Sequence, residues 1–117
     1  MEVFKKHPIF SNYVGSSYGR VFSKTSRKEI LYVPDKDGYL KVMLYKNRFR
    51  RNYRVHRFIY ECFNGIISNG LTVDHLDFTR DNNSIENLES VTIKENCIRR
   101  SCRKDKLWKS QKSILIA

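Results

Sequence analysis

Residues 72–92, TVDHLDFTRDNNSIENLESVT, contain the pattern from which the fold can be predicted. It opens with a short β-branched run that ends in Asp74 and His75, and a turn-rich segment then leads to a second apolar run. Between the two runs lie the amide side chains of Asn82, Asn83 and Asn87. Amides and carboxylates in a turn ordinarily bind their own backbone, so a functional interpretation needs support from the surrounding sequence.

The residues around this stretch predict a strand, a long loop, a second strand and a helix. Leu71 to Val73 form the first apolar run, and Leu88 to Val91 form the second. Thr92 and Glu95 match a capping box, in which both side chains satisfy free main-chain amides at a helix start, so we expect a helix from about Ile93. This order is expected to bring the strand ends and the first helical turn into one small space.

Four side chains expected in that space suit the hydrolysis of a phosphodiester bond. His75 offers an imidazole, whose ordinary pKa of about 6.5 suits a general base that activates water. The side-chain carbonyl of Asn87 is expected to accept a hydrogen bond from the other ring nitrogen and so orient the imidazole. Asp74 and Asn96 offer an anionic and a neutral oxygen, and such hard ligands favour Mg²⁺ or Mn²⁺ over Zn²⁺.

The same residues carry a resemblance to a known family. DHLDFTRDNNSIENLESVT followed by IKEN resembles the HNH endonuclease pattern D-H-x-D-G-x-x-x-N-N-x-x-x-N-L-x-W-V-T-x-x-x-N, specifically that of phage- and intron-encoded homing endonucleases. Upstream, NYVGSSYGRVFS, GYLKVMLY and VHRFIYECF resemble accessory segments of that family, so the resemblance runs from Asn12 to Arg100. Phe78 stands where the pattern has Gly, and Ser90 where it usually has Trp; these departures bear on loop shape and packing.

The resemblance implies a ββα-metal fold and a role for each matched residue. His75 would be the general base, Asn87 the residue that orients it, and Asp74 and Asn96 the ligands of a divalent metal ion. Members with asparagine at the last position typically nick one strand of double-stranded DNA. The N-terminal β region would contact the duplex.

The rest of the chain predicts strands followed by a helix. Strands are expected at Gly19–Ser23, Glu29–Val33, Tyr39–Tyr45 and Arg48–Val55, with a turn at residues 34–38. Apolar residues at helical spacing predict an amphipathic helix from Val55 to about Asn64. The expected fold class is therefore α+β: a small N-terminal β meander with hairpins, then a helix, then the ββα-metal motif.

We expect residues 1–117 to form a single HNH endonuclease domain. It would comprise an N-terminal β DNA-binding region (1–54), a helix with the ββα-metal catalytic unit (55–104) and a basic C-terminal tail (105–117).

The charge of the chain points to a polyanionic partner. The chain has 23 Lys and Arg against 12 Asp and Glu, a formal net charge of +11. Basic residues interleaved with aromatic ones favour a DNA-facing hairpin. The predicted DNA contacts are Arg20, Lys41, Lys46, Arg48, Arg50, Arg51, Arg54 and Arg57 near the strands, and Arg99, Arg100 and Arg103 towards the C-terminus.

Other features exclude several classes. No apolar run reaches the roughly 18 residues of a membrane span, and residues 1–12 lack the apolar core of a signal peptide, so we expect an intracellular protein of the host cytoplasm that is not secreted. Cys62, Cys97 and Cys102 form no C-x-x-C pair, which argues against a disulfide framework or a cysteine-rich zinc site. A monomer is favoured.

Two rival functions are also compatible with the sequence. One is a DNA-binding protein that keeps the fold without turnover, and the other is an RNA-directed or nonspecific nuclease with the same metal chemistry. We also expect Asn82 and Asn83 to bind loop backbone, Asp77 and Asp81 to be solvated or capping residues, His56 to be a packed residue and His7 to lie on the surface.

Overall fold

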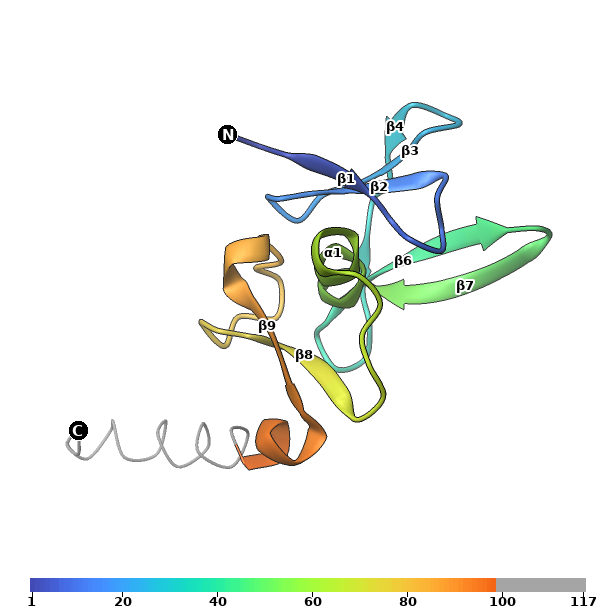
Figure 1. Cartoon of the computed structure of the whole chain (residues 1–117). Coiled ribbons are helices and arrows are strands. Elements are labelled where there is room, and N and C mark those ends of the chain that lie inside the picture. Colours follow the sequence, from blue (N-terminus) through green and yellow to red (C-terminus); the bar gives the residue numbers. More distant parts are fainter. Residues whose placement is uncertain (99–117) are drawn as a thin grey trace.

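Helix α1, Val55–Asn64, lies at the centre of the fold and contacts strands from all three β-sheets (Figure 1). The structure is a computed structural model that describes residues 1–98. The predicted apolar stripe is confirmed, because Val55, Phe58, Ile59 and Cys62 are all buried. The helix ends where Gly65 adopts a φ of +88° and donates its main-chain N–H to the carbonyl of Glu61 at 2.9 Å.

The first sheet is antiparallel and packs one strand closely against α1. Its strands, in spatial order, are β1 (Phe4–Lys6), β2 (Tyr13–Ser16), β3 (Val21–Ser23) and β4 (Lys28–Glu29). A Cβ at Gly15 would lie 2.9 Å from Cδ1 of Ile59, so glycine permits the close approach of β2 to the helix. The predicted strand at Gly19–Ser23 is confirmed in β3, whereas β1 and β2 were not predicted.

The second sheet consists of β5 (Val33–Pro34), β6 (Leu40–Lys46) and β7 (Phe49–Arg54). The predicted single strand at Glu29–Val33 is wrong, because its start pairs with β3 and its end pairs with β6. The chain therefore crosses from one sheet to the next over residues 30–32. The predicted alternation along β6 is confirmed, since Val42 and Leu44 are buried on the face that packs into the core.

A two-residue turn joins β6 to β7. Asn47 and Arg48 have φ values of +50° and +71°, and Lys46 pairs with Phe49. Positive φ at both central residues is the geometry of a type I′ turn, which matches the twist of the flanking strands. Figure 1 shows this hairpin projecting away from α1.

The third sheet and the loop between its strands contain residues 72–92. Strand β8 (Leu71–His75) pairs antiparallel with β9 (Leu88–Thr92), and a short 3₁₀ helix, η1 (Ile85–Asn87), precedes β9. Residues 93–98 are helical, and Oγ1 of Thr92 accepts a hydrogen bond from the main-chain N–H of Glu95 at 3.0 Å. The predicted strand–loop–strand–helix order and its capping threonine are therefore confirmed. Arg99, Arg100, Arg103 and the predicted tail at 105–117 lie outside the described residues.

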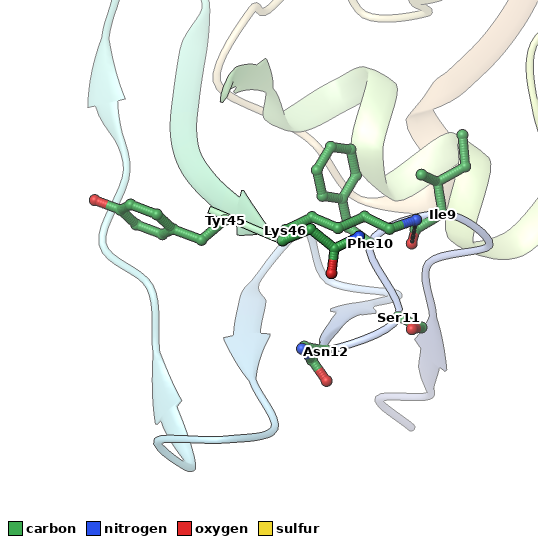
Figure 2. A pocket seen from close by; sticks show the side chains of 7 residues that line it. Ile9, Phe10, Ser11, Asn12, Tyr45 and Lys46 are labelled. Carbon is green, nitrogen blue, oxygen red and sulfur yellow. Dashed lines mark hydrogen bonds between the residues drawn. The ribbon is translucent and has the colours of Figure 1, made fainter. Parts of the chain in front are cut away.

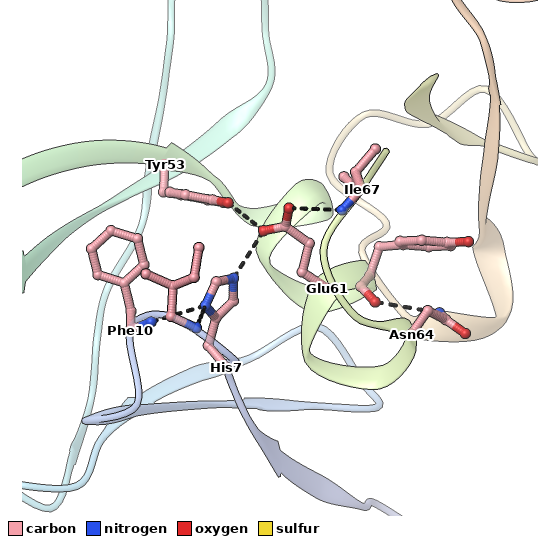
Figure 3. A network of polar contacts seen from close by, with 8 residues as sticks. His7, Phe10, Tyr53, Glu61, Asn64 and Ile67 are labelled. Atoms are coloured by element: carbon pink, nitrogen blue, oxygen red, sulfur yellow. Dashed lines mark hydrogen bonds and ion pairs between the residues drawn. The ribbon is translucent and has the colours of Figure 1, made fainter. Parts of the chain in front are cut away.

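A buried polar network joins the N-terminal segment to α1 (Figure 3). His7 is fully buried, so its predicted surface position is wrong. Its Nδ1 accepts hydrogen bonds from the main-chain N–H groups of Ile9 and Phe10, both at 3.1 Å, and its Nε2 donates to Oε1 of Glu61 at 2.9 Å. The Tyr53 hydroxyl donates to the same carboxylate oxygen. Burial and the Glu61 carboxylate together raise the pKa of Tyr53 to about 12.

The described residues share one hydrophobic core. It includes Tyr13 and Val21 from the first sheet, Leu44 from the second, Phe58 from α1 and Val73 from the third sheet. Cys62 belongs to this core as predicted, whereas Cys97 is exposed. No helix within residues 1–98 is long and apolar enough to cross a membrane.

Candidate active site and nucleic-acid interface

Asp74 and His75 are the last two residues of β8, and both side chains are buried. Their exposed fractions are 5% and 3%, and the pairing register places them opposite Glu89 and Leu88 of β9. A buried carboxylate beside a buried imidazole is costly unless both groups have defined partners, so this pair is a strong candidate for a functional site.

The imidazole of His75 is held by Asn83. The side-chain carbonyl Oδ1 of Asn83 lies 2.8 Å from Nε2 of His75. An amide oxygen only accepts hydrogen bonds, so Nε2 carries the hydrogen and Nδ1 is the nitrogen that can take up a proton. The structure thus gives Asn83 the orienting contact expected of Asn87, and it corrects the expectation that Asn83 binds only loop backbone.

Asn87 instead holds the loop between the two strands together. Its Oδ1 accepts from the main-chain N–H of Asp77 at 2.9 Å, and its Nδ2 donates to Oδ1 of Asp77 and to the carbonyl of Asn82, both at 2.8 Å. The Asn82 side chain donates to the other carboxylate oxygen of Asp77 at 2.7 Å. Hydrogen bonds from Asn82, from the main chain of Thr79 and from Asn87 lower the pKa of Asp77 to about 2. Asp77 is thus the anionic centre of the loop.

The loop also explains why the family pattern has glycine where this chain has Phe78. Phe78 adopts a φ of +64° and donates its N–H to the carbonyl of His75 at 3.1 Å. This left-handed conformation favours glycine, and a non-glycine residue there is strained. Phe78 in place of glycine therefore raises the energy of the backbone next to His75.

A stack of aromatic rings packs against His75. The ring of His56 lies 4.8 Å from that of His75 between centroids, and the ring of Tyr39 lies 5.1 Å from that of His56. His56 is 5% exposed, which agrees with its predicted packed role. Burial, followed by the nearby His75, lowers the pKa of His56 to about 3. This stack was not predicted from the sequence, because its three rings come from positions far apart along the chain.

The predicted metal ligands lie on two different elements. Asp74 is the residue before the end of β8, whereas Asn96 lies partly exposed in the helical segment 93–98, which follows β9. One carboxylate and one neutral amide oxygen suit a hard cation such as Mg²⁺, which keeps several water ligands and needs few from the protein. Within residues 1–98, no three His, Cys, Asp or Glu side chains gather as a metal site. The donor chemistry therefore fits a cation held by few protein ligands.

The basic residues of the β6–β7 hairpin are distributed over both of its faces. The register places Lys41 opposite Arg54 and Tyr45 opposite Arg50 on one face, while Arg51 shares the other face with Leu44. The side chains of Lys46, Arg48, Arg50 and Arg51 are exposed, and Phe49 beside them is 78% exposed. A cationic hairpin with an uncovered aromatic ring suits contacts with a nucleic-acid backbone.

Two of the predicted DNA contacts have acidic partners. Arg20 binds Glu2, with Nε to Oε2 at 2.9 Å, and lies 3.6 Å from Glu29. Arg54 binds Asp35 at 3.0 Å and Asp37 at 3.3 Å. These two guanidinium groups are therefore weaker candidates for phosphate contacts than the hairpin-tip residues. Arg57, on α1, lines a surface depression with Arg51 and Arg54.

Figure 2 shows a small pocket between the hairpin and the N-terminal loop, lined by residues 9–12 and 45–47. Lys46 reaches across it, and its ammonium group donates to the carbonyl of Ile9 at 3.2 Å. The main-chain N–H of Tyr45 donates to the hydroxyl of Tyr13 at 3.1 Å. These bonds brace the hairpin against the first sheet, so its basic tip has a fixed direction.

A β-hairpin with Asp-His at the end of its first strand, an asparagine-rich loop and a following capped helix together define the HNH class of endonucleases. The comparisons agree: residues 53–97 match the HNH endonuclease family, and residues 2–45 match the NUMOD4 motif. The chain belongs to the HNH endonuclease family.

The chain is similar to several phage and viral proteins of that family. It is 38% identical over 85 residues to DNA endonuclease I-HmuI of Bacillus phage SP01, covering 73% of this chain and 49% of that protein. It is 30% identical to H-N-H endonuclease F-TflII of Escherichia phage T5, over 85% of this chain and 52% of the relative. Against the uncharacterized HNH endonuclease L245 of Acanthamoeba polyphaga mimivirus the identity is 34%, over 84% of this chain and 30% of the relative.

The solved structure of I-HmuI, a homing endonuclease that binds and cleaves DNA, has the same fold. It matches with a TM-score of 0.78 and 33% identity, over 87% of this chain and 59% of that one. The chain thus spans about half the length of I-HmuI and F-TflII, and less of L245.

Proposed function

We propose that this protein is a metal-dependent DNA endonuclease that hydrolyses one phosphodiester bond per encounter and so nicks one strand of a duplex. The observation that carries the proposal is the buried Asp74–His75 pair at the end of β8, with Nε2 of His75 fixed by Asn83 at 2.8 Å. The relatives support the same class of reaction, because I-HmuI is a DNA endonuclease and an HNH homing endonuclease, and F-TflII is an H-N-H endonuclease.

In this reaction His75 is the general base. Nδ1 takes a proton from the attacking water, and the Asn83 contact keeps the ring in the tautomer that leaves Nδ1 able to do so. Because the imidazole is buried and restrained, little reorganisation is needed when the proton moves.

Asp74 and Asn96 are the proposed ligands of the divalent cation, which when bound stabilises the charge that develops on the leaving oxygen. Their oxygen donors favour Mg²⁺ or Mn²⁺. The basic hairpin is proposed to hold the duplex through its phosphates, with Lys41, Lys46, Arg48, Arg50 and Arg51 as contacts. The protein is proposed to act as a monomer, because one active site cuts one strand.

Supercoiled plasmid tests the proposal directly. The protein and its His75→Ala variant are incubated with plasmid in Mg²⁺, in Mn²⁺ and in EDTA. Conversion to open circles that needs a metal and is lost in the variant, while gel shifts show retained binding, is the expected result. Tight binding with no nicking in any metal, repeated on a library of genomic targets, would instead favour a DNA-binding protein without turnover.

The nature of the substrate is tested in the same assay. Duplex DNA, single-stranded DNA and RNA of equal length are compared as substrates. Equal cleavage of all three would contradict the proposal and indicate a nonspecific nuclease.

A further inference from the structure

We propose that the N-terminal motif, residues 2–45, has a second task besides contact with DNA: it positions the His75 imidazole, through Tyr39 on one side and Gly19 on the other. This inference rests on the proposed function, because it gives both residues a role towards the proposed base. Tyr39 and Gly19 are positioning residues, since each acts through a neighbour that touches His75.

The first contact is the stack of rings that ends on His75. Tyr39 packs against His56 with an interplanar angle of 22° and a centroid distance of 5.1 Å. His56 packs in turn against His75 at 4.8 Å, and Tyr39 itself lies 6.1 Å from His75. Within residues 1–98 the His56 ring makes ring contacts but no side-chain hydrogen bond, so packing is what holds it. The orientation of the His75 ring is therefore restrained by the His56 ring, and the position of the His56 ring depends in turn on Tyr39.

The outer end of the stack is fixed by two arginines. The guanidinium carbons of Arg54 and Arg80 lie 4.2 and 4.8 Å from the centroid of Tyr39. Arg54 is held by Asp35 and Asp37, and Arg80 donates to the carbonyl of Asp37. The turn at residues 34–38 thus binds β7 through Arg54 and the loop after β8 through Arg80. Tyr39 cannot move away from His56 without disturbing these bonds.

The second contact acts on Asn83, the partner of Nε2. Gly19 has a φ of +91°, and a Cβ built there would lie 2.8 Å from the carbonyl carbon and 2.9 Å from the carbonyl oxygen of Asn83. Next to it, the main-chain N–H of Ile85 donates to the carbonyl of Ser17 at 2.9 Å. The turn of the first sheet therefore supports the backbone of Asn83 at a distance that only glycine allows.

The two contacts restrain different properties of the ring. The side-chain carbonyl of Asn83 selects which nitrogen of His75 carries the hydrogen. The stack limits rotation of the His75 ring about its hydrogen bond to that carbonyl. A base acts efficiently only when both are fixed, because a displacement of about 1 Å can cost about 100-fold in rate. The N-terminal motif contributes to both restraints, although His75 lies in the other half of the chain.

Four variants separate positioning from general destabilisation. Tyr39→Leu removes the ring, and Tyr39→Phe keeps it. Gly19→Ala places a methyl group against Asn83, whereas Gly70→Ala is its matched control, because Gly70 has a similar φ of +86° with no atom within 4 Å of an added Cβ. Thermal unfolding of each variant identifies the temperature below which all are folded.

Each variant is measured in two ways. Nitrogen NMR of the His75 ring at about pH 8.5, where an ordinary imidazole is neutral, reports which ring nitrogen carries the hydrogen. Single-turnover nicking of supercoiled plasmid, with gel shifts on the same DNA, separates the rate of the chemical step from the Kd.

Tyr39→Leu and Gly19→Ala are expected to broaden the His75 signals or mix its two tautomers, and to lower the single-turnover rate by about 10- to 100-fold at unchanged Kd. Tyr39→Phe and Gly70→Ala should keep the wild-type spectrum and rate. The inference is overturned if Tyr39→Leu and Gly19→Ala leave the His75 spectrum unchanged, or if their rate loss follows entirely from a higher Kd.

Failure of the proposed function would be seen separately. If the wild-type protein nicks no DNA, the proposed activity is wrong, and the NMR comparison alone decides whether Tyr39 and Gly19 hold the ring. A single wild-type tautomer that becomes mixed in both variants would still support positioning of His75.

Discussion

The side-chain carbonyl of Asn83 accepts a hydrogen bond from Nε2 of His75 at 2.8 Å, although eight positions separate the two residues along the chain. This contact, and not one from Asn87, fixes the tautomer of the proposed base. The two asparagines therefore have different tasks, which mutation can separate.

Asn83→Ala should impair nicking more than stability. Loss of a group that orients a functional imidazole typically costs about 10- to 100-fold. We expect that loss in the single-turnover rate, with Kd for plasmid unchanged. Asn83→Asp retains an accepting oxygen and should recover part of the rate, which a purely structural role for Asn83 would not explain.

Asn87→Ala should mainly destabilise the loop. It removes two bonds to Asp77 and one to the carbonyl of Asn82. Loss of these partly exposed bonds should lower the free energy of unfolding by about 1–3 kcal/mol, measured by urea denaturation. An unchanged denaturation midpoint, together with a lost nicking rate, would return the orienting role to Asn87.

The Glu61 network should make stability depend on acid pH. Burial raises the pKa of Glu61, but hydrogen bonds from His7 and Tyr53 outweigh it, so the folded-state pKa lies below the ordinary 4.5. A lowered carboxyl pKa contributes stability that is complete above the unfolded-state value and is lost as the pH falls through the folded-state value. The urea concentration at the unfolding midpoint should therefore decrease as the pH is lowered below about 4.5.

Glu61→Gln is the control for this pH dependence. The variant should be less stable than wild type at neutral pH and should show a flatter decline in acid, because the amide does not titrate. Parallel pH profiles for the two proteins would show that other carboxylates cause the acid instability.

Arg48→Gly should separate DNA binding from folding. Arg48 occupies the second central position of the type I′ turn with a φ of +71°, where glycine is preferred. Removing that strain should leave the melting temperature unchanged or raise it, while loss of a tip cation weakens DNA binding. A lower melting temperature would mean that the Arg48 side chain stabilises the turn.

DNA binding should weaken steeply with salt. If six to ten phosphates are contacted, affinity should fall by about 10³ to 10⁵ between 50 and 200 mM salt. Arg51→Ala, at the hairpin, should reduce the slope of log K against log salt by about one. Arg20→Ala is the matched comparison: its charge is already paired with Glu2 and Glu29, so its slope should stay near that of wild type.

The sequence predicted best the elements with a clear period or cap. Helix α1 matches the expected range because its apolar residues recur at helical spacing, and Thr92 starts the last described helix as its capping box predicted. Strands β1 and β2 were missed because each is short and neither alternates clearly between apolar and polar residues.

The site was predicted in its residue types but not in its internal contacts. The pair at Asp74 and His75 stands out from spacing alone. Which loop amide meets the imidazole depends on how Asp77 folds the loop, and sequence spacing carries no such information. His7 was misjudged because it follows Lys5 and Lys6 in the sequence, while its burial comes from the distant Glu61 and Phe58.

The bond between His7 and Glu61 has a consequence for protein engineering. It joins the two segments that match separate families, one from residue 2 to 45 and the other from 53 to 97. A chimera that fuses this catalytic unit to a foreign N-terminal segment would bury the Glu61 carboxylate without its imidazole donor. Grafts should therefore transfer residues 2–97 together, with the junction placed beyond them.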